Sequence, residues 1–210
     1  MIVSIDGPAG AGKSTVASCL AERLGFRYLD TGAMYRALTW LAIRESIPLD
    51  RGDRLGRLAQ QHPVDLDEHG RVSIAGADVT AAIRRSNIDR MVPVVARHPD
   101  VRLVMRERQR ELAELGDAVI EGRDIGSIVV PGAEVKVYLT ADTDVRARRR
   151  QSERPDIGPD ALTTDLVRRD REDAPRMQPA GDAIEIDTTD LQVEDVVARI
   201  EELVRERQPA

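Results

Sequence analysis

Short apolar runs separated by stretches of helical spacing dominate the pattern of the 210-residue chain. The runs that predict buried strands lie at residues 2–5, 26–30, 118–120, 135–139 and 183–186. Between them apolar residues recur three and four positions apart, as they do from Val16 to Leu24, and this spacing predicts amphipathic helices. Strands that alternate with helices are typical of a parallel sheet with both faces covered. We therefore predict an α/β fold of three layers, with a five-stranded parallel sheet and helices on both faces.

A different period interrupts this pattern between residues 62 and 90. Apolar and polar residues alternate over 64–67 and 72–75, on either side of a turn that contains Gly70. This predicts an antiparallel hairpin, which a third short piece at 78–80 extends. Residues 48–61 are polar and broken, and the pattern assigns no element to them. Because such a hairpin cannot belong to a parallel sheet, we expect residues 62–90 to form an antiparallel β insert within a single domain that spans residues 1–210.

The segment directly after the first apolar run fits the phosphate-binding loop G-x-x-x-x-G-K-[ST]. Its residues are Gly7, Pro8, Ala9, Gly10, Ala11, Gly12, Lys13 and Ser14, with Thr15 following. Glycines let the backbone bend so that its N–H groups point at phosphate oxygens, and a helix that begins at Lys13 directs its positive end at the same anion. Lys13 then reaches the β- and γ-phosphates, and the Ser14 hydroxyl is a Mg²⁺ ligand. We expect residues 7–15 to bind ATP with Mg²⁺.

Composition narrows the partners that such a site can serve. The formal net charge is −6, so the overall field repels nucleic acid and anionic membranes. Aromatic residues make up only 2% of the chain, which is too few for stacking platforms on single-stranded nucleic acid. No apolar run approaches the roughly 20 residues of a membrane span, and the single cysteine, Cys19, cannot form an internal disulfide. We expect a cytoplasmic protein with neither nucleic acid nor membrane as a partner.

Arginine is concentrated between residues 146 and 176. Runs of charge are usually solvated helix faces. Here Arg146, Arg149 and Arg150 share one helical face, so we expect them to converge on one anion, with Arg149 at the ATP phosphates. Residues from about 148 to 160 are polar and broken by proline and glycine, and this predicts a mobile lid.

A phosphate-binding loop alone fits ATPases, GTPases, motors and kinases equally. The chain lacks the N-K-x-D motif that reads guanine, and no D-x-x-G switch follows the second strand, so a GTPase is disfavoured. Phosphoryl transfer between two nucleotides needs cations distributed over donor and acceptor phosphates, and it needs a cover that excludes water. The lid segment can serve as this cover. The arginines that can serve as the cations are Arg36, Arg123, Arg146, Arg169 and Arg176.

Four blocks of the chain together resemble bacterial-type cytidylate kinase, one of the P-loop nucleoside monophosphate kinases. They run from Ile5 to Ser14, from Leu29 to Arg36, from Gly122 to Gly126 and from Arg169 to Arg176. The D-[ST]-G-A-x-Y-R and G-R-D motifs are more specific than the phosphate loop, and the resemblance extends nearly end to end, the insert included. It implies transfer of the ATP γ-phosphoryl group to CMP or dCMP by a monomer. It also implies that the insert binds the nucleoside monophosphate.

The resemblance implies roles for individual residues as well. The residues that would bind the acceptor nucleotide are Thr31, Arg36, Arg102, Arg123, Asp124, Arg169 and Asp173. Arg102 and Asp124 would read the base, and Asp173 would bind ribose beside Arg169. The residues of catalysis would be Lys13, Arg123 and Arg176, with Arg176 bridging phosphates.

Two positions depart from the family, and several alternatives stay open. Glu121 stands where aspartate is usual before G-R-D, and Pro93 aligns with a serine that contacts the base. Thr31 is equally a helix cap by its local sequence, and Asp124 is a candidate cap of the turn in which it lies. The activity itself has two alternatives. One is a kinase for UMP or another small acceptor, and the other is a nucleotide-dependent switch without catalysis.

Overall fold

The structure, a computed structural model, describes residues 1–67, 70–153, 158–174 and 177–207. The chain divides into two compact units. Met1–Phe26 and Asp117–Ala210 form the first, called here the P-loop unit, and Arg27–Gly116 form the second, called the central unit. Residues 154–157 of the predicted lid and 68–69 of the predicted hairpin turn lie outside the described residues.

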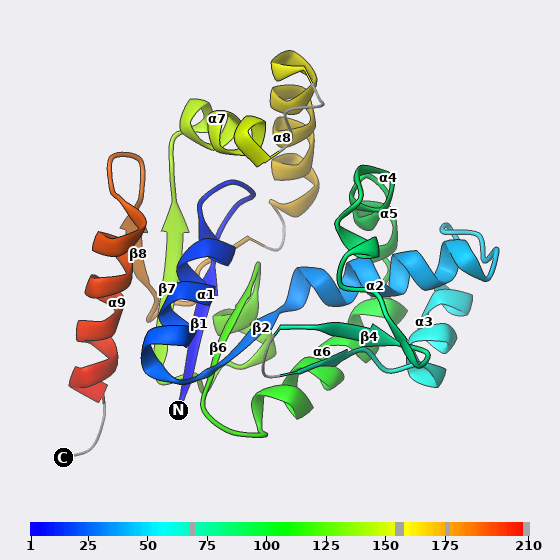
Figure 1. The fold of residues 1–210 in the computed structure, drawn as a ribbon, viewed down its shortest axis with the longest axis horizontal. Coiled ribbons are helices and arrows are strands. Elements are labelled where there is room, and N and C mark those ends of the chain that lie inside the picture. The colour runs from blue at the N-terminus through cyan, green and yellow to red at the C-terminus, as the bar shows by residue number, and fades with distance from the viewer. Residues whose placement is uncertain (68–69, 154–157, 175–176, 208–210) are drawn as a thin grey trace. The chain divides into compact units, whose positions relative to one another are not determined.

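The main sheet has the five strands that were predicted, and their order is β2-β6-β1-β7-β8 (Figure 1). Its strands are β1 (Ile2–Asp6), β2 (Arg27–Asp30), β6 (Ala118–Gly122), β7 (Val135–Thr140) and β8 (Ile184–Asp187). β1 pairs in parallel with β6 and with β7, and β7 pairs in parallel with β8. Val3 and Ile5 of β1 are completely buried, as is Ser4 between them. A strand buried on both faces has a nearly continuous apolar sequence, which is why these strands could be recognised.

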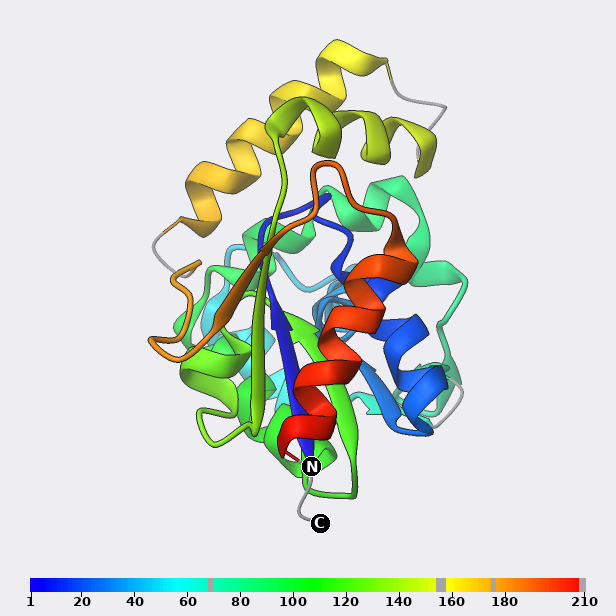
Figure 2. The ribbon, with the colours of Figure 1, turned by 90° about the vertical axis from the view of Figure 1, so that its left-hand side faces the viewer.

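Two helices of the P-loop unit, α1 (Lys13–Leu24) and α9 (Val193–Arg207), pack against each other on one face of the strands (Figure 2). α1 begins after Gly12 and ends at Gly25, whose left-handed conformation (φ 68°) lets its N–H bond back to the last turn. Such a residue is usually glycine because a Cβ disfavours that conformation. The unit also contains α7 (Thr143–Glu153), α8 (Pro159–Asp173) and a short π-helix, η2 (Ile125–Val129).

The central unit is mainly helical and carries a small antiparallel sheet. Its helices are α2 (Thr31–Arg44), α3 (Gly52–Gln61), η1 (Ala82–Arg84), α4 (Ser86–Asp89), α5 (Val92–Ala96) and α6 (Pro99–Ala113). Its strands are β3 (Asp65–Leu66), β4 (Val72–Ile74) and β5 (Ala77–Asp78), in the order β3-β4-β5. Leu66 pairs with Val72, and Ile74 pairs with Ala77. The predicted antiparallel hairpin is confirmed, and its third piece begins one residue earlier than expected.

The stretch before the hairpin, which the pattern left without an element, forms a helix. α3 buries Leu55, Leu58 and Ala59, and it packs against α6. Gly56 lies so close to α6 that a Cβ there would be 3.0 Å from the Cβ of Asp100. In the sequence, only Leu55 and Leu58, three positions apart among charged residues, indicated a helix here. Packing of this narrow apolar stripe on α6 outweighs the two glycines and the polar composition.

Asp30, not Thr31, caps α2. The Asp30 carboxylate accepts the N–H of Ala33 at 2.8 Å, and Thr31 is the first residue of the helix. The other carboxylate oxygen lies 2.7 Å from a guanidinium nitrogen of Arg36 and 3.3 Å from one of Arg84. The suggested cap role of Thr31 is therefore wrong, because the residue before it has both the acceptor carboxylate and the non-helical backbone (φ −80°, ψ 93°) that a cap requires.

Replacement of Asp30 by alanine should destabilise the protein by about 1–3 kcal/mol, because it removes the helix cap and the partner of a half-buried arginine. Asp53 is the matched control. It contacts Arg51 and Arg57, but its side chain is 46% exposed, whereas that of Asp30 is 7% exposed. Asp53→Ala should therefore leave the stability nearly unchanged. Urea unfolding of both variants measures the difference, and equal losses would contradict the structural role of Asp30.

Candidate active site

The phosphate-binding loop follows a path that glycine alone can take. Gly7, Gly10 and Gly12 have φ angles of 145°, 78° and 89°. A Cβ at Gly7 would lie 2.2 Å from the carbonyl oxygen of Leu139, and one at Gly10 would lie 2.9 Å from that of Arg146. The loop is thus held against neighbouring backbone as well as curled. These are the conditions in which backbone N–H groups can surround a phosphate.

Two cations lie on successive carbonyl groups of this loop. Lys13 Nζ donates to the carbonyl oxygen of Pro8 at 2.9 Å, and the guanidinium of Arg123 donates to that of Gly7 at 2.6 Å. Burial, together with the positive charge of Arg123, lowers the pKa of Lys13 from 10.5 to about 7, although Glu121 and nearby aspartates oppose the change. Like charges so close together favour the binding of an anion.

Two carboxylates, Asp173 and Asp6, contact Arg123 and the turn that follows it. Asp173, in the last turn of α8, lies 3.2 Å from Arg123 Nε. Asp6, at the end of β1, accepts the N–H groups of Ile125 and Gly126, each at 2.8 Å. Burial raises the pKa of Asp6 to about 6, although these hydrogen bonds and Lys13 lower it. Asp6 therefore bonds to the turn after β6, and Arg123 from that turn bonds back to the start of the loop.

Arg146 and Arg149, which the spacing predicts to converge on one anion, have different protein partners in the structure. Arg146 is 6% exposed, and its guanidinium pairs with both carboxylate oxygens of Asp170 at 3.1 and 2.7 Å. It also donates to the carbonyl oxygen of Ala9 at 3.2 Å. Arg149 donates instead to Thr188, at 2.9 Å to the hydroxyl and 2.7 Å to the carbonyl. Arg146 thus connects α7, α8 and the phosphate loop, while Arg149 lies at the loop's other side.

Arg149 nevertheless remains beside the expected position of the nucleotide. One of its guanidinium nitrogens is 3.9 Å from the place where a Cβ of Gly12 would be. The Thr188 hydroxyl, its partner, also donates to the carbonyl oxygen of Ala11 at 3.2 Å. Thr188 could not be recognised from the sequence, because a threonine after a strand has no motif around it.

The central unit carries a second group of cations. Arg36 and Arg84 both contact the Asp30 carboxylate, and Thr31, beside it, is 4% exposed. A Cβ at Gly32 would lie 3.2 Å from a guanidinium nitrogen of Arg36, so the small residue leaves room for this side chain. Arg102 lies in α6, separate from this group in the sequence.

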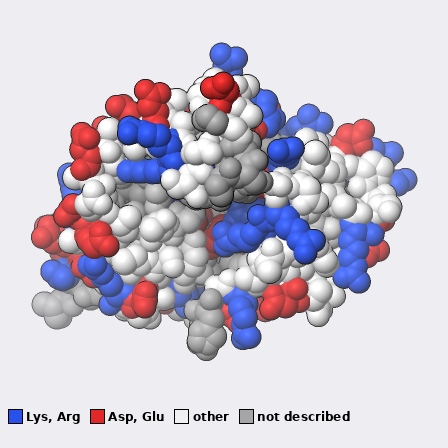
Figure 3. Space-filling view, turned by 45° about the horizontal axis from the view of Figure 1, so that its top comes forward, with Lys and Arg blue, Asp and Glu red and all other residues white. Residues whose placement is uncertain are grey.

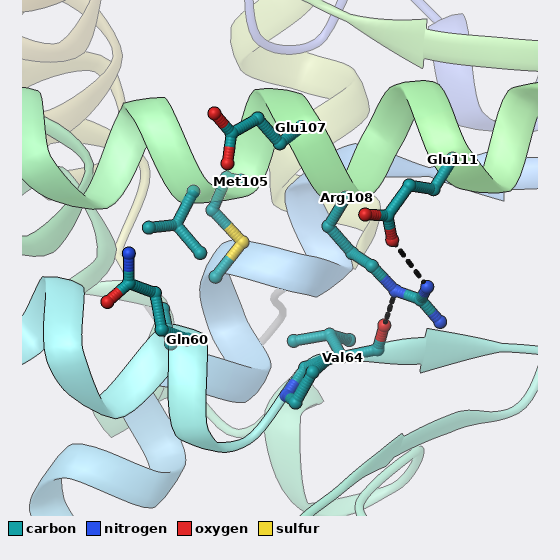
Figure 4. Close-up of a pocket in the computed structure, with 9 residues that line it drawn as sticks. Gln60, Val64, Met105, Glu107, Arg108 and Glu111 are labelled. Carbon is teal, nitrogen blue, oxygen red and sulfur yellow. Dashed lines mark hydrogen bonds and ion pairs between the residues drawn. The ribbon is translucent and has the colours of Figure 1, made fainter.

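The Arg27–Gly116 unit also contains a pocket of about 180 Å³ between α3, the start of the small sheet and α6 (Figure 4). Val64 and Met105 form an apolar floor. Arg108 lies at its edge, where it donates to the carbonyl oxygen of Val64 at 2.9 Å and to Glu111 at 2.8 Å. A guanidinium engaged in this way, with a carboxylate beside it, is a poor phosphate ligand. This pocket is not the nucleotide site.

Comparison with known proteins identifies the family. The sequence model of the family named cytidylate kinase matches residues 3–206. The chain belongs to the cytidylate kinase family. It is 47% identical over 216 residues to a cytidylate kinase of Geobacillus sp. (strain WCH70), with 98% of this chain and 96% of the relative covered. Against the cytidylate kinase of Bacillus subtilis (strain 168) the identity is 41%, with the same two shares covered.

Solved structures agree on the fold. The shikimate kinase of Bacteroides thetaiotaomicron superposes with a TM-score of 0.53 at 17% identity, and 98% of each chain is covered. Membership of the cytidylate kinase family makes the protein an enzyme that phosphorylates CMP or dCMP. The alternatives raised by the sequence, a kinase for a different acceptor and a non-catalytic switch, are not favoured.

The residues expected from the cytidylate kinase resemblance lie in both units. The P-loop unit carries Lys13, Arg123, Asp124, Arg149, Arg169 and Asp173, and the central unit carries Thr31, Arg36 and Arg102. Arg176 lies outside the described residues. Arg169 is 11% exposed, and its Nε is 3.0 Å from Asp165. Asp124 is 6% exposed and makes no capping hydrogen bond to η2, because Asp6 accepts those N–H groups instead. The suggested cap role of Asp124 is thereby excluded for this helix.

The protein should take up protons when it binds nucleotide above neutral pH. In the protein without nucleotide the pKa of Lys13 is lowered to about 7, so its side chain is mostly neutral at pH 8. Phosphate oxygens beside it favour the ammonium form, so the pKa rises on binding and about one proton is taken up for each ADP bound at pH 8. Calorimetric titration in two buffers of different ionisation enthalpy measures this number.

Lys13→Arg is the matched control, because a guanidinium is already charged at pH 8 in the free protein. Its ADP binding should show less than half of the proton uptake of the wild type. Equal buffer dependence in the two proteins would assign the uptake to another group.

Proposed function

We propose that the P-loop unit binds ATP through Gly7–Thr15 and supplies the cations that act on the transferred phosphoryl group. The pair formed by Lys13 and Arg123 on adjacent loop carbonyls carries this proposal. In phosphoryl transfer, negative charge is spread over the equatorial oxygens of a loose transition state, so fixed cations stabilise it without reorganisation. Arg176 is proposed as a third cation, and Arg149 as a ligand of the ATP phosphates.

Mg²⁺ fits this site through Ser14. The residue follows Lys13 in the first turn of α1, and its side chain is exposed. Magnesium usually takes few protein ligands and binds mainly through phosphate oxygens and water, so one hydroxyl at this place is sufficient. Bound there, the ion neutralises charge on the β- and γ-phosphates.

We infer that Thr31, Arg36 and Arg102 are ligands of the acceptor nucleotide, as are Asp124, Arg169 and Asp173. Arg36 is prepared for a phosphate, since Asp30 fixes one of its nitrogens at 2.7 Å, while its Nε is buried without a hydrogen-bond partner in the described residues. A donor in this state gains most from an anionic acceptor. Arg123 contacts the phosphate from the P-loop unit, and Arg169 and Asp173, one helical turn apart on α8, bind ribose.

The remaining features of the proposal concern the whole enzyme. We propose that residues 62–90 act as the part that binds the monophosphate and that the region from about 148 to 160 acts as a lid, within one kinase domain. Interspersed acidic and basic side chains on the visible face (Figure 3), with a net charge of −6, suit a monomer with no nucleic acid or membrane partner. A single cysteine, Cys19, suits the cytoplasm. No described helix is both long and apolar enough to cross a membrane.

Phosphorylation of a panel of acceptors tests the proposal. ADP release should be fast with CMP and dCMP, much slower with UMP and AMP, and slowest with no acceptor. Lys13→Ala should lower kcat by at least about 100-fold, because its ammonium acts on charge that develops in the transition state. Lys136→Ala is the matched control, since this other lysine pairs with Asp182 at 2.9 Å and should leave kcat unchanged. Near-normal turnover by Lys13→Ala would remove the loop from the mechanism.

Asp124→Asn should weaken the preference for cytosine over uracil. Cytosine presents an N4 amino donor where uracil has an O4 acceptor, and a carboxylate accepts from the amino group. An amide can turn its own N–H₂ toward uracil. We therefore expect kcat/KM to fall steeply for CMP and much less for UMP, so that their ratio shifts by about 1–3 kcal/mol. If stability falls while the ratio stays constant, Asp124 has no part in base recognition.

A further inference from the structure

Asp6 uses both oxygens of a buried carboxylate on two consecutive backbone amides. Its Oδ1 accepts the N–H of Ile125, and its Oδ2 accepts the N–H of Gly126, each at 2.8 Å. The side chain ends β1, and the residue is 6% exposed. The two amides belong to the residues that directly follow Asp124, so Asp6 fixes the backbone at the point where Asp124 leaves it.

The turn is tied to the start of the phosphate loop at a third point. Arg123 precedes Asp124 and donates to the carbonyl oxygen of Gly7 at 2.6 Å, and Gly7 is the neighbour of Asp6 in the chain. Asp124 is therefore flanked on both sides by residues bonded to the end of β1. A shift of the Asp124 backbone relative to the phosphate loop would have to break at least one of these bonds.

Close packing beneath the turn leaves it little freedom. A Cβ at Gly126 would lie 2.7 Å from Ser4 Oγ, so the turn rests directly on β1. Ser4 lies two residues before Asp6 and therefore on the same face of the strand. Its hydroxyl is buried without a hydrogen-bond partner in the described residues. Ser4 thus contacts the turn without holding it, which makes it a suitable control.

Keeping Asp6 ionised in this buried position costs free energy, which a neutral side chain in its place would not. Burial and the nearby charge of Asp124 both raise the pKa of Asp6, to about 6, so ionisation at neutral pH is unfavourable relative to an exposed carboxyl. An asparagine would avoid this cost. It has only one acceptor oxygen, however, and its N–H₂ group would face the second amide. Two parallel acceptors in this place need a carboxylate.

We propose that Asp6 is a positioning residue that determines base specificity by holding Asp124 in register with the phosphate-binding loop. The inference rests on the proposed role of Asp124 in reading the base. Asp6 itself contacts neither base nor phosphate, and it acts through the backbone of Ile125 and Gly126.

Kinetics of four proteins test this proposal: the wild type, Asp6→Asn, Ser4→Ala and Asp124→Asn. In Asp6→Asn the ratio of kcat/KM for CMP to that for UMP should fall by about 10- to 100-fold, as expected when the support of a positioned group is lost. Ser4→Ala removes a group from the same face of β1 and should leave the ratio unchanged. An unchanged ratio in Asp6→Asn, alongside a changed ratio in Asp124→Asn, would overturn the proposal and leave the role of Asp124 intact.

A constant ratio in Asp124→Asn would instead disprove the proposed base contact, and the inference would fall with it. Amide hydrogen exchange gives a readout that does not depend on substrate. The amides of Ile125 and Gly126 should both be protected in the wild type, and one of them should exchange at least about tenfold faster in Asp6→Asn. Equal protection in both proteins would show that Asp6 does not hold the turn.

If Asp6→Asn fails to fold, Asp6→Glu serves in its place. It keeps the charge and both acceptor oxygens but moves them by one methylene. Its ratio should lie below that of the wild type, and a value equal to the wild type would overturn the proposal.

Discussion

The feature on which the rest of the site depends is the close approach of two positive charges to one stretch of backbone. Lys13 and Arg123 donate to the neighbouring carbonyls of Pro8 and Gly7, and their mutual repulsion contributes to the lowered pKa of Lys13. Such an arrangement is unfavourable in the free protein and becomes favourable when phosphate enters. Binding energy is thus directed to the reacting phosphoryl group, where charge changes during the reaction.

Placement of the acidic side chains follows from this constraint. Glu121, Asp6 and Asp173 each oppose the fall in the pKa of Lys13. Asp173 also pairs with Arg123, and Asp6 accepts two backbone amides. These carboxylates moderate the repulsion between Lys13 and Arg123. Lys13 itself donates to the Pro8 carbonyl, a neutral partner that a phosphate oxygen can replace.

A second use of charge is structural, and it distinguishes arginines that connect parts of the protein from those proposed to bind the nucleotide. Arg146 has Asp170 and the Ala9 carbonyl as partners and is almost completely buried. Removal of one member of such a pair leaves a buried charge without compensation. Arg36 is held on one side by Asp30 and retains a buried donor without a partner among the described residues. The difference between them lies in unused hydrogen-bonding capacity, not in exposure.

Sequence alone predicted the parts of the molecule that local chemistry determines. The five strands of the parallel sheet, the glycine-dependent loop and the end of α1 at Gly25 each follow from residue type and spacing. α3 was missed because its narrow apolar stripe becomes stable only on α6. Arg146 was placed with Arg149 by helical spacing alone. Their different partners, Asp170 and Thr188, come from segments distant in the sequence.

Asp30 and Asp6 show the same limit at the site itself. Each stood inside a recognised motif, yet neither received a role, because a motif records which residues occur together and not which backbone amides they bond. Asp30 caps a helix and orients Arg36, and Asp6 fixes the turn that carries Asp124. Both are the last residues of parallel strands, at the end of the sheet where such folds place their ligands. In each case a strand ends in a carboxylate that holds a neighbouring segment in place. The position of the side chain proposed to bind the nucleotide, Arg36 or Asp124, is therefore set by the end of a strand.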